Sequence, residues 1–176
     1  MKWVHFPLHP ETPAEGQSLE ELFRGRNVDM LAMHARMQDL MTAEGLPYGR
    51  RTRTCNSRLA QELGKWADTE RHTEAIHDAL FRAYFVQGIN IGNESELVDI
   101  ARSVGLPADE ARRVLEDRRF KDAVDTDWAK SRAYGVAAVP TFVSGGYGVV
   151  GAQPYVALEQ LLVQRGARRK AVGEQE

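Results

Sequence analysis

The side chains that could carry covalent or metal chemistry are few in this sequence. Cys55 is the only cysteine among 176 residues, so the chain contains no Cys-X-X-Cys pair and cannot form an internal disulfide. The five histidines show neither a His-Glu-X-X-His motif nor another useful ligand spacing. We therefore expect no metal site and no intact catalytic dithiol. A cysteine near a helix start can be reactive, but we interpret Cys55 as a half-buried packing residue.

Pro140 is the second informative position, because it precedes the apolar run Thr141-Phe142-Val143. Proline cannot donate to a sheet ladder, so it belongs at a strand's first residue, at an edge or at a bulge. A Ser-Gly-Gly-Tyr turn, a second apolar run at 148–150 and a helix opening at Pro154 follow it. These residues predict a strand–turn–strand–helix unit. The Gly-Gly-Tyr-Gly segment lacks the following lysine of a phosphate loop, so we predict a hairpin turn there.

Helices are expected to dominate the chain before this unit. A short strand is predicted at 2–6, and a capping box at Ser18 and Glu21 predicts a helix start. Asn27 is the predicted N-cap of the next helix. We interpret the methionines that follow it as one apolar, core-facing helix side. Helix 56–67 is predicted to have Leu59, Leu63 and Trp66 on one side, and helix 70–87 an apolar stripe of Ile76, Leu80, Phe81, Tyr84 and Phe85. Asn93 opens the next predicted helix, which ends at Gly105 and buries Leu97, Val98, Ile100 and Ala101. The remaining predicted helices are one that begins at Leu106-Pro107 with Val114 and Leu115 facing inward, 121–134 ending at Gly135, and one in which Leu158, Leu161 and Leu162 are buried.

Four segments of the chain resemble the DsbA-like thioredoxin domain, and more narrowly its FrnE-type branch, which is related to 2-hydroxychromene-2-carboxylate isomerases. They are FPLHPETPAEG at 6–16, CNSRLAQELGKWA at 55–67, HDALFRAYFVQGINIGNESELVDIARSVGL at 77–106 and GVAAVPTFVSGGYGVVGAQPYVALEQLL at 135–162. The resemblance implies an α/β thioredoxin-like fold with a helical insertion and without its N-terminal βα unit. The domains that it implies are a thioredoxin-like sheet with flanking helices at 1–54 and 121–166, an inserted helical subdomain at 55–120, and a disordered tail at 167–176.

The resemblance also implies a substrate-binding site at Val139 and Pro140. The residue matching Pro140 is a cis-proline at the active-site edge, and the residue matching Val139 offers its backbone to a bound peptide or thiol. We interpret Phe142, Tyr147 and Tyr155 as packing residues rather than ligand contacts. The strand and helix that carry Cys-X-X-Cys, or its serine variant, would lie before residue 2, so no catalytic residue is intact.

The absent strand would lie in the middle of the sheet, between the strand matching 2–6 and the strand matching 141–143. Its absence leaves unpaired backbone groups, each of which costs about 1–3 kcal/mol when buried. Three outcomes are open: residues 2–6 pair directly with 141–143, a partner chain supplies the strand, or a segment upstream of Met1 carries it. We favour the upstream segment.

The resulting functional expectation is thiol–disulfide oxidoreductase activity on a peptide or a small thiol. There are two alternatives. The first is a glutathione-dependent isomerase, with glutathione as its cofactor, and the second is an inactive fragment or peptide-binding module. A net charge of −2 predicts no nucleic-acid partner. No apolar run approaches the ~20 residues that span a bilayer, and no secretory signal is visible, so we expect no membrane partner and a cytoplasmic location. A homodimer formed through the incomplete sheet is a further expectation.

Overall fold

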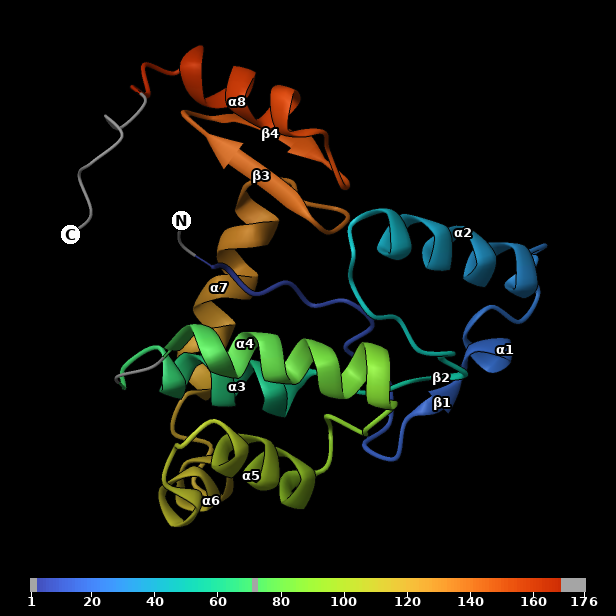
Figure 1. Ribbon diagram of the computed structural model, residues 1–176. Helices are drawn as coiled ribbons and strands as arrows, with labels where there is room; N and C mark the ends of the chain where they lie inside the picture. Colours follow the sequence, from blue (N-terminus) through green and yellow to red (C-terminus); the bar gives the residue numbers. More distant parts are fainter. Residues whose placement is uncertain (1–2, 71–72, 169–176) are drawn as a thin grey trace. The chain divides into compact units, whose positions relative to one another are not determined.

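The computed structural model describes residues 3–70 and 73–168 (Figure 1). The chain divides into two compact units, Met1–Trp128 and Ala129–Glu176. The predicted boundaries of an inserted subdomain, 55 and 120, stay a prediction, and residues 169–176 of the predicted tail lie outside the described residues.

The helices and strands follow one another along the chain in this order: β1 (Gln17–Ser18), α1 (Leu19–Leu22), α2 (Met30–Ala43), β2 (Arg53–Thr54), α3 (Arg58–Ala67), α4 (Thr73–Arg82), the π-helical turn η1 (Ala83–Gln87), α5 (Glu94–Ser103), α6 (Ala108–Glu116), α7 (Lys121–Ala133), β3 (Thr141–Ser144), β4 (Tyr147–Val150) and α8 (Tyr155–Val163).

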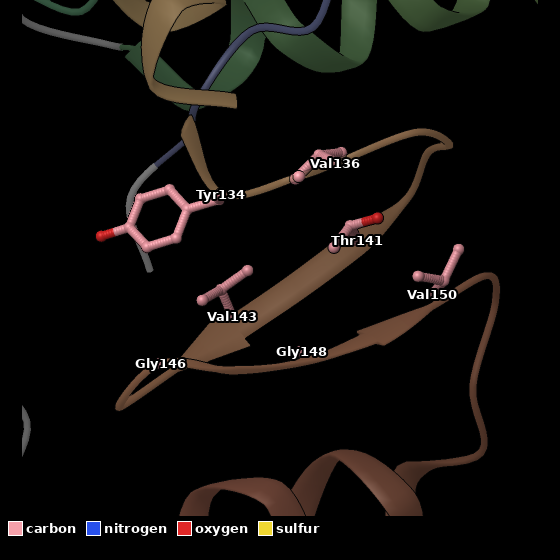
Figure 2. A pocket seen from close by; sticks show the side chains of 8 residues that line it. Tyr134, Val136, Thr141, Val143, Gly146, Gly148 and Val150 are labelled. Atoms are coloured by element: carbon pink, nitrogen blue, oxygen red, sulfur yellow. The ribbon is translucent and has the colours of Figure 1, made fainter. Parts of the chain in front are cut away.

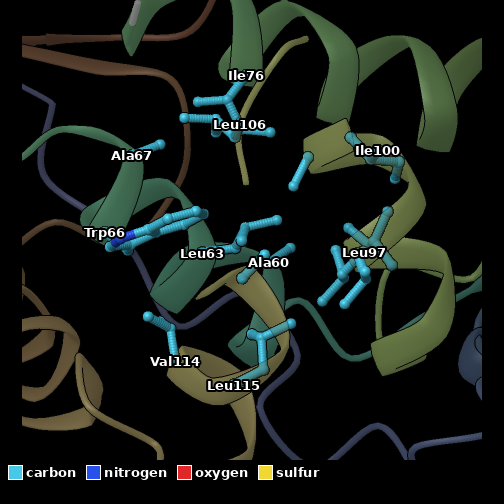
Figure 3. Close-up of a cluster of buried hydrophobic side chains, with 14 of the residues drawn as sticks. Ala60, Leu63, Trp66, Ala67, Ile76, Leu97, Ile100, Leu106, Val114 and Leu115 are labelled. Carbon is cyan, nitrogen blue, oxygen red and sulfur yellow. The ribbon is translucent and has the colours of Figure 1, made fainter. Parts of the chain in front are cut away.

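The core of the first unit lies among α3, α4, α5 and α6, where apolar side chains at helical spacing meet (Figure 3). The predicted inward residues are confirmed on α3, α5 and α6, and each large aliphatic side chain buried in this way stabilises the fold by about 1.5–3 kcal/mol. Phe81 on α4 differs, because 52% of its surface is exposed although the sequence places it on the apolar stripe. The side chains that are almost completely buried include Leu63, Ile76, Leu97, Val98, Val114 and Leu115.

Helix ends follow the predicted capping residues at most positions. At α1 the Ser18 hydroxyl accepts from the Glu21 N–H and the Glu21 carboxylate accepts from the Ser18 N–H, which confirms the capping box. Asn93 caps α5 through its side-chain oxygen, and Gly135 has the left-handed φ of +65° expected after α7. Asn27 is not the cap of α2: Asp29 is, because its carboxylate accepts from the first backbone N–H groups of the helix.

The strand predicted at 2–6 is wrong over the described part of that segment. Residues 3–6 form no strand, and residue 2 lies outside the described residues. Two backbone groups of this segment bond to side chains instead of to a neighbouring strand. The His5 N–H donates to the Asp127 carboxylate at 2.9 Å, and Gln61 Nε2 donates to the Phe6 carbonyl at 3.1 Å. Among the described residues, β1 pairs only with β2 and β3 only with β4.

The prediction that the methionine-bearing helix lines the core is also wrong. Helix α2 contains no buried residue, and Leu31 is 73% exposed. Met33, Met37 and Leu40 are exposed as well. The periodic spacing marks an apolar side of the helix correctly, but periodicity does not specify which element covers that side.

The second unit is a β-hairpin with a helix on one face. Strands β3 and β4 are antiparallel, and Phe142 lies opposite Val149. The turn residues Gly145 and Gly146 both have positive φ, 54° and 80°, which is the requirement of a type I′ hairpin turn. Helix α8 packs against both strands. Its Leu161 is buried as predicted, whereas Leu162 is 49% exposed, which corrects the prediction for that residue.

Candidate functional site

The predicted substrate-binding residues lie immediately before β3. The Val139-Pro140 peptide bond is cis, and both residues are exposed, Val139 by 45%. Among the described residues, no backbone hydrogen bond is made by Val139. Its N–H and C=O are therefore available to pair with another extended chain. Pro140 contributes only its carbonyl, which accepts from the Gly151 N–H at 2.7 Å.

A hollow of about 260 Å³ lies next to this position (Figure 2). Figure 2 shows Thr141, Val143 and Val150 directed into it from the hairpin, with the chain after α7 on its other side. None of its lining residues is charged, so it suits an uncharged side chain of a bound molecule. The lining residues are Tyr134, Gly135, Val136, Thr141, Val143, Gly146, Gly148 and Val150.

Tyr134 and Val136 were not predicted to take part in a site. The signal that could have indicated them is their position: they flank Gly135, where the helix ends and the chain turns toward Pro140. The packing role predicted for Tyr147 and Tyr155 is wrong, because both rings are exposed. The Arg165 guanidinium covers the Tyr147 ring instead, with its carbon 3.4 Å from the ring centroid.

Cys55 belongs to the first unit and has the character of a packing residue. It is partly buried against the hydrophobic core. Burial raises the pKa of its thiol, and this effect outweighs the nearby Arg53 and Arg51 and the hydrogen bond with the Ile91 backbone. A raised pKa disfavours the thiolate, which is the nucleophilic form. In the described part of the chain no group of three His, Cys, Asp or Glu side chains could hold a metal ion.

Two polar clusters in the first unit were not foreseen from the sequence. Glu62 is completely buried and accepts hydrogen bonds from Arg58 at 2.6 Å and from Arg118 at 2.7 and 2.9 Å. Lys65 pairs with Asp127 at 2.6 Å beside His5. The charged groups of both clusters are held in ion pairs, Glu62 with Arg58 and Arg118 and Lys65 with Asp127, so we assign both clusters to stabilising the fold.

Comparison with known proteins defines the class. The model of the DSBA-like thioredoxin domain matches residues 1–163, and the chain belongs to that family. The predicted thioredoxin-like α/β fold is confirmed by the solved structures that it resembles. No helix in the described part of the chain is long and apolar enough to cross a membrane.

Two of these structures are informative. The chain is 28% identical to a probable DsbA oxidoreductase from Streptomyces coelicolor, with a TM-score of 0.80 over 95% of this chain and 75% of that one. A candidate protein disulfide isomerase from Nitrosomonas europaea shares the fold at 16% identity, with a TM-score of 0.61 over 78% of this chain and 74% of that one. No curated protein matches the chain.

Proposed function

We propose that the chain belongs to a DsbA-like thiol–disulfide oxidoreductase and that its C-terminal unit binds the substrate beside the reacting sulfur. The chain belongs to the DSBA-like family, and one observation carries the proposal. Val139, the residue before the cis-proline, is exposed, and its backbone N–H and C=O make no backbone hydrogen bond to any described residue. An extended peptide pairs with such a backbone as one strand pairs with another.

The hairpin supplies orientation rather than a nucleophile. The N–H and C=O of Val139 would hold the peptide backbone next to its cysteine. Pro140 has no N–H, so no backbone donor at that position competes for the substrate sulfur. The uncharged hollow lined by Val143 and Val150 lies beside this position and would receive a neighbouring side chain of the peptide.

The redox dithiol that this function needs is supplied by a Cys-X-X-Cys segment outside the chain. Its first thiolate attacks one sulfur of the substrate disulfide, and the other substrate sulfur leaves as a thiolate and takes up a proton. The second cysteine then attacks the mixed disulfide. The substrate is released as a dithiol, and the two cysteines of the segment become the new disulfide. Cys55 takes no part in this exchange.

The test is reduction of insulin by dithiothreitol. The chain alone is expected to match the uncatalysed rate, and Cys55→Ser should change nothing. A chain extended at its N-terminus by the in-frame upstream segment should accelerate the reaction, and replacing both cysteines of that segment by serine should abolish the gain. Activity of the unextended chain that Cys55→Ser removes would contradict the proposal. An extended chain without redox activity that isomerises substrate only with glutathione would favour the isomerase alternative.

Substrate binding can be measured separately on the chain as it stands. An extended peptide with a blocked cysteine should shift the backbone amide resonance of Val139 more than those of α8. Shifts confined to the first unit would contradict the assignment of the binding site. This measurement does not depend on the missing dithiol.

A further inference from the structure

Arg51 differs from the other partly buried cations of the first unit in its partners. Among the described residues of that unit, the lysines and arginines that are neither buried nor fully exposed are Arg51, Arg58 and Lys65. Arg58 and Lys65 each pair with a carboxylate. The guanidinium of Arg51 forms one hydrogen bond among the described residues, from Nη1 to the Tyr84 hydroxyl at 2.7 Å, and no ion pair with them. A partly desolvated cation without a counter-charge is unfavourable, so a negatively charged partner would stabilise it.

The π-helical turn η1 holds two aromatic rings beside this guanidinium. Its carbon lies 5.2 Å from the ring centroid of Tyr84 and 5.7 Å from that of Phe85, and the two rings meet edge to face at 4.8 Å. The segment before Arg51 is fixed against the turn, because the Gly49 N–H donates to the Phe85 carbonyl at 2.9 Å and a Cβ on Gly49 would collide with the Val86 carbonyl. The guanidinium is therefore positioned by rings that do not neutralise its charge, on a kind of helical turn that is frequent at functional sites.

One edge of the Arg51 guanidinium carries donors without partners. Nε is buried and has no hydrogen-bond partner in the described structure, and Nη2, on the same edge, forms no hydrogen bond to a described residue. Two parallel N–H groups of a guanidinium match the two oxygens of a carboxylate. Apolar surface continues from this point, because the Phe85 ring stacks on that of Phe81 at 6.2 Å between centroids and Phe81 is 52% exposed. The arrangement suits a carboxylate with an apolar body beside it.

We propose that Arg51 is the anchor of a binding site for such a carboxylate, with Tyr84 and Phe85 positioning the guanidinium and Phe81 contacting the apolar body. The C-terminal residue of a peptide and a free organic acid present the same two groups, a carboxylate and an apolar neighbour. The ligand oxygen at Nη2 neutralises a charge that the described chain leaves unpaired. The site belongs to the first unit and requires neither the cis-proline nor a dithiol, so its failure would leave the proposed function untouched.

Titration of the full chain followed by NMR tests the proposal with 3-phenylpropionate as the probe. The acid should give saturable shifts of the backbone amides of Arg51 and of residues 83–87. Its neutral amide, 3-phenylpropanamide, should bind at least about tenfold more weakly, because it offers no charge to the guanidinium. The dipeptide acetyl-Ala-Phe with a free C-terminus distinguishes the sources: tighter binding than 3-phenylpropionate supports a peptide terminus, and weaker binding supports a free acid. Inorganic phosphate that binds as tightly as the acid would overturn the proposal, as would the absence of saturable shifts.

Two neighbouring arginines supply the variant and its matched control. Arg51→Gln should weaken binding of 3-phenylpropionate at least about tenfold, whereas Arg50→Gln, which changes an exposed arginine one position away, should leave the dissociation constant unchanged. Arg51→Lys keeps the charge for folding but lacks the planar fork, so it should also bind more weakly than the wild-type chain. Urea denaturation without ligand shows whether each variant is folded. Equal weakening by Arg50→Gln and Arg51→Gln, or folded Arg51 variants with wild-type affinity, would overturn the proposal.

Discussion

At the scale of single residues, Glu62 is the strongest electrostatic feature of the fold. Burial acts to raise the pKa of its carboxyl, but hydrogen bonds from Arg118 and Arg58 outweigh burial and hold the pKa below its usual value. Removing one member of a buried ion pair leaves uncompensated charge and costs about 3–5 kcal/mol. Because Arg58 keeps Asp125 as a second partner and Arg118 is 44% exposed, Glu62→Gln is expected near the lower limit of that range.

Urea denaturation measures this loss. The control is Asp99→Asn, since Asp99 is 65% exposed in its pair with Arg102, and such surface pairs contribute about 0–1 kcal/mol. Equal losses in the two variants would show that the Glu62 cluster does not stabilise the interior.

His5 predicts a pH dependence of stability. Burial and the nearby Lys65 ammonium lower the pKa of His5 from 6.5 to about 4, against the opposing effect of Asp127. Its buried Nε2 has no hydrogen-bond partner in the described structure. The neighbouring His77 acts to lower the same pKa and Asp68 to raise it.

The sign follows from which state binds the proton more tightly. Well above pH 6.5 His5 is neutral in both the folded and the unfolded state, so it does not lower the free energy of unfolding. Between pH 6.5 and 4 the unfolded chain takes up the proton first, so the free energy of unfolding falls, by at most about 3 kcal/mol for this pKa difference. Urea denaturation between pH 4 and 8 should show this loss. His5→Phe should reduce the slope of the free energy of unfolding against pH. The control His34→Phe, which keeps a ring stacked on Tyr48, should leave that slope unchanged. The same slope in the wild-type chain and in both variants would contradict the role of His5.

At the scale of elements, Asn93 shows how one side chain sets a helix boundary. Its Oδ1 accepts from the N–H groups of Ser95 and Glu96 at the start of α5. Asn93→Ala is expected to lower the free energy of unfolding by about 1 kcal/mol, because those donors lose their partner. Asn93→Asp should keep most of the stability, since a carboxylate caps equally well and suits the helix dipole. Chemical denaturation of both variants checks the expectation, and equal destabilisation by Ala and Asp would argue against capping.

The elements that sequence reasoning predicted correctly are those specified by local chemistry. The Ser18 capping box, the Asn93 cap and the hairpin turn at Gly145-Gly146 each depend on residues a few positions apart. The failures involve distant partners. Residues 3–6 have strand-forming side chains, but the long-range bond from His5 to Asp127 replaces a ladder. The apolar side of α2 is exposed for a similar reason, because the local sequence pattern does not specify which distant element would pack against it.

In the candidate site, too, some residues could be predicted from the sequence and others depend on the tertiary fold. Val139 and Pro140 were predicted from the resemblance to a family and from the rule that excludes proline from a strand interior. Tyr134 and Val136 reach the hollow only because the chain reverses between α7 and β3. That reversal is a tertiary feature, so the residue pattern alone did not indicate it.

At the scale of the whole molecule, apolar burial is unevenly distributed. The large buried cluster belongs to the first unit, in α3 to α6 and the turns between them. In the described part of the second unit, Leu161 is the only buried apolar residue. Stability follows buried apolar contact, and regions with few such contacts open through small free energies.

We therefore expect two levels of amide protection. Under native conditions the amides of β3, β4 and α8 should exchange through openings several kcal/mol smaller than the global unfolding that releases α3 and α5, a difference typical of local opening. Hydrogen exchange followed by mass spectrometry in low urea measures both levels. Leu63→Ala should lower the protection of α3 and α5 by about 2–5 kcal/mol, because it opens a cavity in the main core. The hairpin should change less, since its openings do not require the core to unfold. A single protection free energy over both units, reduced equally by Leu63→Ala, would instead show that the hairpin and the helical core unfold as one cooperative structure.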